Sequence, residues 1–177
     1  MKVLEFPNFT QSTDYTCGAS CLLSILYYYG IQDYQEIDLE KLISATPEDG
    51  ASVDNIKKFL RKKKFLIDAG VMKISTIQKY IDQEIPVLVV MQAWASKKNI
   101  NYAKTKVNGH YVVVIGYNKE YLFFTDPVLE NIWYLPKKEF ESRRHEHDNQ
   151  GNDYINYGIA IHGKKPDYNE LILEKIE

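Results

Sequence analysis

A cysteine stands where a polar, turn-forming segment meets an apolar run of helical length. The segment is QSTDYTCGASCLLSILYYYG, residues 11–30, with Cys17 at the junction. Unpaired N–H groups at a helix N-terminus stabilise negative charge, and a thiolate is the reactive form of cysteine. Cys17 is therefore a candidate nucleophile. Cys21 lies one turn further into the predicted helix, where we expect a buried, unreactive thiol.

A cysteine nucleophile needs a base, and the base needs a third group to orient it. His110 begins the β-branched run GHYVVVIGY, and Asp126 ends the run YLFFTD. A hairpin turn at residues 118–120 would make these two strands antiparallel and return Asp126 to the level of His110. We therefore predict that His110 is the base and that Asp126 orients it. The other histidines are His145, His147 and His162.

Acyl transfer also needs donors for the oxyanion that develops on the attacked carbonyl. The backbone N–H of Cys17 is one candidate, and the side-chain amide of Gln11 is the other. Each residue alone has a plain structural explanation, as a buried cysteine, a strand-end histidine or a turn-forming aspartate before Pro127. Their combination and order are what indicate catalysis.

These residues also carry a resemblance to the papain-like cysteine peptidases. The Gln11–Cys17 segment, GHYVVVIGY and TDP are most similar to the bacteriocin-processing, double-glycine-leader peptidases of bacteria and their stand-alone relatives. The resemblance spans roughly residues 11–163. It implies that Cys17 is the nucleophile, His110 the general base and then acid, Asp126 its orienting partner and Gln11 an oxyanion donor. It also implies a peptide or protein substrate, such as a leader peptide, and a protease that processes it.

The distribution of patterns predicts an α+β fold in a single papain-like peptidase domain, residues 1–177. After the helix that starts at Cys17, helical patterns occupy residues 39–45, 52–63 (with Ser52 as N-cap) and 74–83. Strand patterns follow at residues 86–94, 109–117, 121–127, 131–135 and 157–163. We expect a helical part, with the nucleophile at a helix N-terminus, packed on a largely antiparallel sheet.

The composition limits which classes of binding partner we expect. The formal net charge is −2, so no global basic field favours nucleic acid, and the basic run at residues 57–64 is expected to be the solvated face and last turn of a helix. No apolar run approaches the ~20 residues of a membrane span, and the N-terminus does not resemble a signal peptide. Two cysteines four residues apart cannot form a disulfide framework. These features favour a cytoplasmic protein with reduced thiols, although signal-independent export stays open.

Two segments invite other interpretations. The tract HEHD, residues 145–148, could complete a zinc site with Cys17 and Cys21, but we expect it to be irregular and a poor chelate, and we predict no metal and no cofactor. Residues 93–108 fit neither helix nor strand and predict a long loop beside the substrate groove. Trp94 and Tyr102 are its candidate groove-lining residues.

Three function classes remain open from the sequence: a cysteine peptidase, an acyltransferase of the kind found in phytochelatin synthases and transglutaminases, and a catalytically silent peptide-binding relative. The processing peptidases usually stand at the N-terminus of an ATP-binding transporter. These 177 residues contain no phosphate-binding GxxxxGK[ST] loop, so a transporter or secretion partner is left open.

Overall fold

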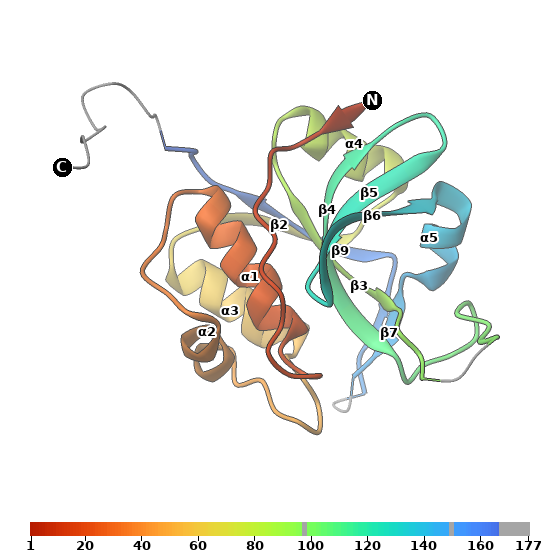
Figure 1. The fold of residues 1–177 in the computed structure, drawn as a ribbon, viewed down its shortest axis with the longest axis horizontal. Helices are drawn as coiled ribbons and strands as arrows, with labels where there is room; N and C mark the ends of the chain where they lie inside the picture. The colour runs from red at the N-terminus through yellow and green to blue at the C-terminus, as the bar shows by residue number, and fades with distance from the viewer. Residues whose placement is uncertain (97–98, 149–150, 167–177) are drawn as a thin grey trace.

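The computed structural model describes residues 1–96, 99–148 and 151–166 and shows a helical part packed on an antiparallel sheet (Figure 1). The helices are α1 (Cys17–Tyr28), α2 (Glu36–Leu42), α3 (Val53–Lys62), α4 (Ile74–Asp82) and α5 (Lys137–Arg143). The main sheet has the order β2 (Leu66–Val71), β9 (Tyr157–His162), β3 (Val87–Gln92), β4 (Gly109–Tyr117), β5 (Tyr121–Asp126) and β6 (Leu129–Pro136), and β1 (Lys2–Val3) pairs with β4. The predicted α+β class is confirmed.

Helix α1 is the centre of the helical part because almost every side chain in it is buried. Only Tyr27 of its residues is partly exposed. The helix ends in a Schellman motif, in which the N–H groups of Gly30 and Ile31 donate to the carbonyls of Tyr27 and Leu26. Gly30 has a φ of 74°, a conformation in which a side chain would be strained. The motif therefore ends α1 before Gly30.

Capping residues help to set where the shorter helices α2 and α3 begin. Ser52 accepts a hydrogen bond from the Asn55 N–H, which confirms it as the N-cap of α3. Helix α2 begins and ends three residues before its predicted range, because Gln35 and Asp38 form a capping box and Ser44 adopts a φ of 52° beyond the C-terminus. In the basic run, the Lys and Arg side chains of α3 lie opposite its buried residues, as predicted for an amphipathic helix.

The predicted hairpin joins β4 and β5 at residues 118–120. Asn118 Oδ1 accepts hydrogen bonds from the N–H groups of Glu120 and Tyr121, and this Asx turn closes the connection. Val113 pairs with Thr125, so the two strand ends that carry His110 and Asp126 lie at the same end of the sheet. All strand pairs of the main sheet are antiparallel.

Five elements of the described structure, including β1, lie outside the predicted set. Strand β2 is an exposed edge strand that contains Asp68 and Gly70, residues uncommon in strands. Helix α5 is short and buries only Phe140. The expectation that residues 145–148 are irregular was wrong: His145–His147 form β7, which pairs with β8 (Asp153–Ile155). Within the described residues, no helix combines the length and apolar character that crossing a membrane requires.

Candidate active site

Cys17 is the first residue of α1 and is only 7% exposed. The preceding Thr16 does not cap the helix, because its hydroxyl exchanges hydrogen bonds with Thr13 instead. The first N–H groups of α1 therefore remain directed at the start of the helix, where the Cys17 sulfur lies. The backbone N–H groups of Tyr111 and Gly18 act on this sulfur and lower the pKa of the thiol.

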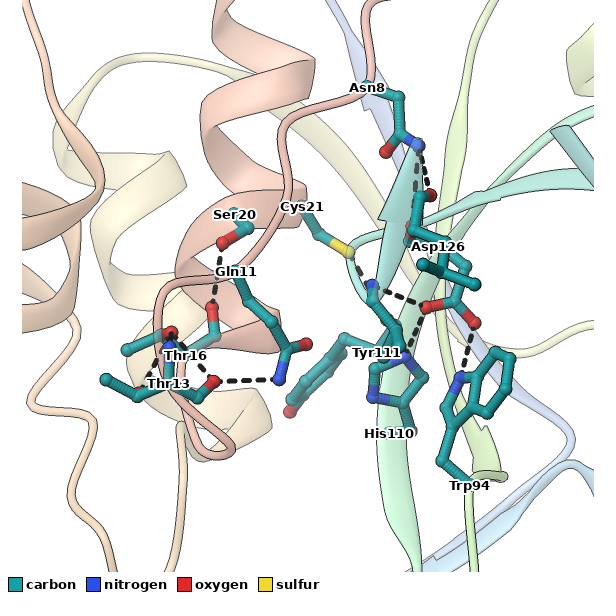
Figure 2. Close-up of polar contacts among 12 residues, drawn as sticks. Asn8, Gln11, Thr13, Thr16, Ser20, Cys21, Trp94, His110, Tyr111 and Asp126 are labelled. Atoms are coloured by element: carbon teal, nitrogen blue, oxygen red, sulfur yellow. Dashed lines mark hydrogen bonds and ion pairs between the residues drawn. The ribbon is translucent and has the colours of Figure 1, made fainter. Parts of the chain in front are cut away.

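His110 and Asp126 meet at the end of the β4–β5 hairpin. His110 Nε2 lies 2.8 Å from Asp126 Oδ1, and both side chains are buried (Figure 2). Since Nε2 is bonded to the carboxylate, Nδ1 is the ring nitrogen left to interact with the Cys17 thiol. His110 lies close enough to Cys17 for the two side chains to shift each other's pKa, so the structure brings the three predicted residues together.

Besides His110, two other donors hold the carboxylate of Asp126. Its Oδ1 also accepts the Val128 N–H at 2.9 Å. Its Oδ2 accepts the indole N–H of Trp94 at 2.8 Å (Figure 2). Trp94 has a φ of 54°, and its ring packs edge-on against Trp133 at 5.4 Å between centroids. Trp94 therefore holds the carboxylate that contacts His110.

The pKa directions in this site favour a charged pair. Burial opposes ionisation of Cys17, but the hydrogen bond and the charge of His110, with the two backbone N–H groups, hold the pKa of the thiol below its ordinary value. Burial likewise opposes a cationic His110, but Asp126 and Cys17 raise the pKa of the imidazole above its ordinary value. Burial alone would raise the pKa of Asp126, yet its bonds from His110, Val128 and Trp94 lower it. A thiolate beside an imidazolium is the state that these directions describe.

Gln11 lies on the N-terminal segment, and its side chain extends toward β4 (Figure 2). Its Nε2 donates to the Thr13 carbonyl at 2.7 Å, and its buried Oε1 has no hydrogen-bond partner among the described residues. An amide nitrogen carries two hydrogens, so one N–H of Gln11 is left after the bond to Thr13. The backbone N–H of Gln11 donates to the Pro127 carbonyl at 2.7 Å, which ties this segment to the loop after Asp126.

Glu36 at the start of α2 secures the turn that leads into α1. Its carboxylate accepts the Ser12 N–H at 3.0 Å and the Ser20 hydroxyl at 2.8 Å. Burial opposes its charge, but Thr16, Ser12 and Ser20 together hold the pKa of Glu36 below its ordinary value. The segment between Gln11 and Cys17 is thus fixed at both of its ends.

A cavity of ≈ 450 Å³ opens beside Cys17. The loop of residues 93–108 contributes Lys106 and Val107 to it. The expectation that Trp94 and Tyr102 line the groove was wrong for this cavity, because Trp94 turns to Asp126 and Tyr102 accepts the Ala95 N–H through its hydroxyl. Residues 97 and 98 of the predicted loop lie outside the described residues.

The histidines of the HEHD tract have protein partners. His145 Nε2 lies 2.7 Å from the Thr105 carbonyl, and His147 Nδ1 lies 3.0 Å from Asp153 Oδ1. In the ranges that the structure describes, no three His, Cys, Asp or Glu side chains are grouped to hold a metal ion.

The family of the chain follows from its sequence. The model of the Peptidase_C39 like family matches residues 3–152, a range that includes Cys17, His110 and Asp126. The chain belongs to this C39-like family. Among curated proteins, none matches the chain.

Solved structures share the fold of this C39-like protein. The peptidase domain of Streptococcus ComA, a bifunctional ABC transporter involved in quorum sensing, is 20% identical, with a TM-score of 0.67 over 90% of this chain and 100% of that one. A protein described as a C39-like peptidase from Bacillus anthracis is 17% identical, with a TM-score of 0.66 over 94% and 100%. A double glycine motif protease from an AMS/PCAT transporter, solved with a leader peptide, is 16% identical, with a TM-score of 0.63 over 90% and 93%. The predicted peptidase fold is therefore confirmed.

The charged pair predicts fast alkylation of Cys17 below the pH at which an ordinary thiol reacts. Because the pKa of Cys17 is lowered, its thiolate persists as the pH falls below ~8.5, and the rate drops only through the lowered pKa. Iodoacetamide kinetics between pH 4 and 10, with mass-spectrometric site assignment, measure this profile. His110→Ala should return it to that of an ordinary thiol. A wild-type rate that rises only near pH 8.5 would contradict the pairing.

Trp94→Phe should reduce the thiolate fraction, because it removes one of the bonds that hold Asp126. A net hydrogen bond is worth ~0.5–1.5 kcal/mol, so alkylation at pH 6 should slow by roughly 2- to 10-fold. Trp133→Phe is the matched control, since the buried Trp133 N–H has no partner among the described residues. Equal rates in the two variants would show that the Trp94 bond does not position Asp126.

Proposed function

We propose that this protein is a cysteine peptidase that hydrolyses a peptide bond through a thioester acyl-enzyme. The observation that carries the proposal is the buried chain of contacts from Cys17 at the N-terminus of α1 through His110 to Asp126. Membership of the C39-like family supports it. The substrate class that the family resemblance favours is a leader peptide or another protein segment to be processed.

In this mechanism His110 takes the proton from the Cys17 thiol, and the thiolate attacks the carbonyl carbon of the substrate. The carbonyl π electrons move to oxygen, which becomes the oxyanion. When the oxyanion collapses, the C–N bond breaks and His110 gives its proton to the leaving amine. His110 then takes a proton from water, the hydroxide adds to the thioester, and the C–S bond breaks to release the carboxylic acid and restore the thiol.

Two donors are proposed to stabilise the oxyanion. The Cys17 backbone N–H lies at the first position of α1, where a helix leaves such groups unpaired. The Gln11 Nε2 would supply the second N–H, beyond the one that it gives to Thr13. Since Thr13 requires a donor at 2.7 Å, its carbonyl fixes which end of the Gln11 amide carries the nitrogen.

The acyltransferase alternative uses the same Cys17, His110 and Asp126 and differs only in the acceptor, an amine in place of water. A silent peptide-binding relative would need none of the bonds that hold Asp126, so their presence favours an enzyme. The proposal includes a transporter or secretion partner that presents the substrate.

Cys17→Ala should abolish turnover with the fold intact, while Cys21→Ala should leave it largely unchanged. Cys21 is buried, donates to the Tyr111 carbonyl at 3.3 Å, and has its pKa raised by burial, so its thiol has no route to a substrate. Release of new peptide termini, followed by mass spectrometry, measures turnover, and circular dichroism checks the fold. Turnover retained in Cys17→Ala would refute the assignment. Amine-capped products in place of free acids would favour the acyltransferase.

Gln11→Ala should lower kcat by a factor of ~10²–10³, the usual effect of losing one oxyanion donor, with little change in KM. Gln83→Ala, at the exposed C-terminus of α4, is the control and should match the wild type. An unchanged kcat in Gln11→Ala would remove Gln11 from the oxyanion site and leave the roles of Cys17 and His110 standing.

A further inference from the structure

The cavity beside Cys17 adjoins the place where a bound substrate would react. Cys17 and Gly109, the residue before His110, both line it. Other parts of its lining come from the loop before α3, which includes Pro47 and Ala51, and from the chain around β7. A cavity of ≈ 450 Å³ in this position is large enough to receive a long side chain next to the scissile bond.

Aromatic residues form part of the wall. Tyr15, Tyr111 and Tyr154 all line the cavity. The hydroxyls of Tyr111 and Tyr15 donate to the Ala51 carbonyl and to Glu40, so these two residues offer a ligand mainly ring surface. Ring surface suits the methylene stem of lysine or arginine and attracts a cationic group.

The charged groups that line the cavity are mostly acidic. They are Asp14, Glu48, Asp49, Glu146 and Asp148, against Lys106 and the titratable His147. Two of these acids already interact with other groups of the protein. Asp148 accepts hydrogen bonds from Asn152, and Asp49 also takes part in an interaction. Glu146 is the acid whose surroundings indicate a ligand.

Glu146 is immobilised against the catalytic strand. The fully buried Gln92 donates through Nε2 to Glu146 Oε2 at 2.7 Å and to the His145 carbonyl at 3.0 Å, and its Oε1 accepts the Asn108 N–H. A methyl group added at Gly109 would fall 2.1 Å from Glu146 Oε2, so the carboxylate lies directly against the backbone beside His110. A side chain at position 109 would have to displace the Glu146 carboxylate from this place.

This carboxylate lacks a full counter-charge. Within the described part of the chain, Glu146 makes no ion pair with a lysine or arginine. Burial raises its pKa, against the weaker effects of the His147 N–H, Gln92 and the two neighbouring histidines. A partly desolvated carboxylate is stabilised when a cation and its hydrogen bonds replace the lost water.

We propose that this pocket binds a lysine or arginine side chain of the substrate next to the scissile bond, with Glu146 as its counter-ion. The proposal rests on the peptidase function proposed above and names its substrate class: a segment with a basic residue at the cut, where a glycine would leave the pocket empty. Lys106 lines the same cavity and would compete for Glu146, so Lys106→Gln should strengthen the preference for a basic residue.

The first test maps cleavage in a peptide library made with a protease that spares lysine and arginine. Termini that appear with wild type and not with Cys17→Ala should be enriched in lysine or arginine at one position beside the cut. A matched substrate pair with arginine or its neutral isostere citrulline there should differ in kcat/KM by roughly 10- to 100-fold, the scale of a charge-assisted hydrogen bond. Glu146→Gln should remove this difference, while Glu130→Gln, exposed on β6, should keep it.

The outcomes separate the two proposals. Cys17-dependent cleavage without basic enrichment, or equal arginine and citrulline rates in the wild type, overturns the pocket proposal and leaves the peptidase standing. Absence of any Cys17-dependent cleavage counts against the peptidase, and the pocket is then tested by binding alone. Nα-acetyl-arginine amide should slow Cys17 alkylation more than the citrulline amide does, and equal protection would overturn the proposal. These wild-type comparisons hold even if Glu146→Gln fails to fold.

Discussion

The site depends on burying three ionisable groups, Cys17, His110 and Asp126, without losing their charge. Taking charges out of water costs several kcal/mol per ion unless partners replace the solvent. Here each charge has such partners: backbone N–H groups on the sulfur, Asp126 on the imidazole, and Val128 and Trp94 on the carboxylate. If one partner is removed, the pKa values shift in the direction that favours the neutral forms of the groups. The surrounding architecture supplies these partners.

Three parts of the chain converge to supply them. Helix α1 brings the sulfur from the helical part, the β4–β5 hairpin brings the histidine and carboxylate from the sheet, and the N-terminal segment runs between the two (Figure 1). That segment is tied to the helical part through Glu36 and to the sheet through the bond from Gln11 to Pro127. Both ties fix the position of Gln11, so the N-terminal segment acts as a positioning element.

The sequence predicts those parts of the site that are set by local geometry. Cys17 is recognisable because a helix begins there, and the meeting of His110 with Asp126 follows from the length of one hairpin. The role of Trp94 could not be predicted from the sequence. Its hydrogen bond to Asp126 depends on the positive φ of Trp94 itself and joins residues that are 32 positions apart. The Gln92–Glu146 contact joins residues that are 54 positions apart. Glu146 lies in strand β7, which the polar sequence HEHD does not predict. Long-range polar contacts of this kind carry no periodic signal.

The protonation state of His110 tests the central claim most directly. Nitrogen-15 NMR of the histidine ring, compared between the wild type and Cys17→Ala from pH 5 to 10, reports whether the imidazole is charged and whether the thiolate holds it so. The account predicts a cationic His110 through neutral pH and well above its ordinary pKa of ~6.5 in the wild type, with a lower pKa in Cys17→Ala. A neutral imidazole at pH 7.5 in the wild type, with the same titration in both proteins, would contradict a thiolate–imidazolium pair.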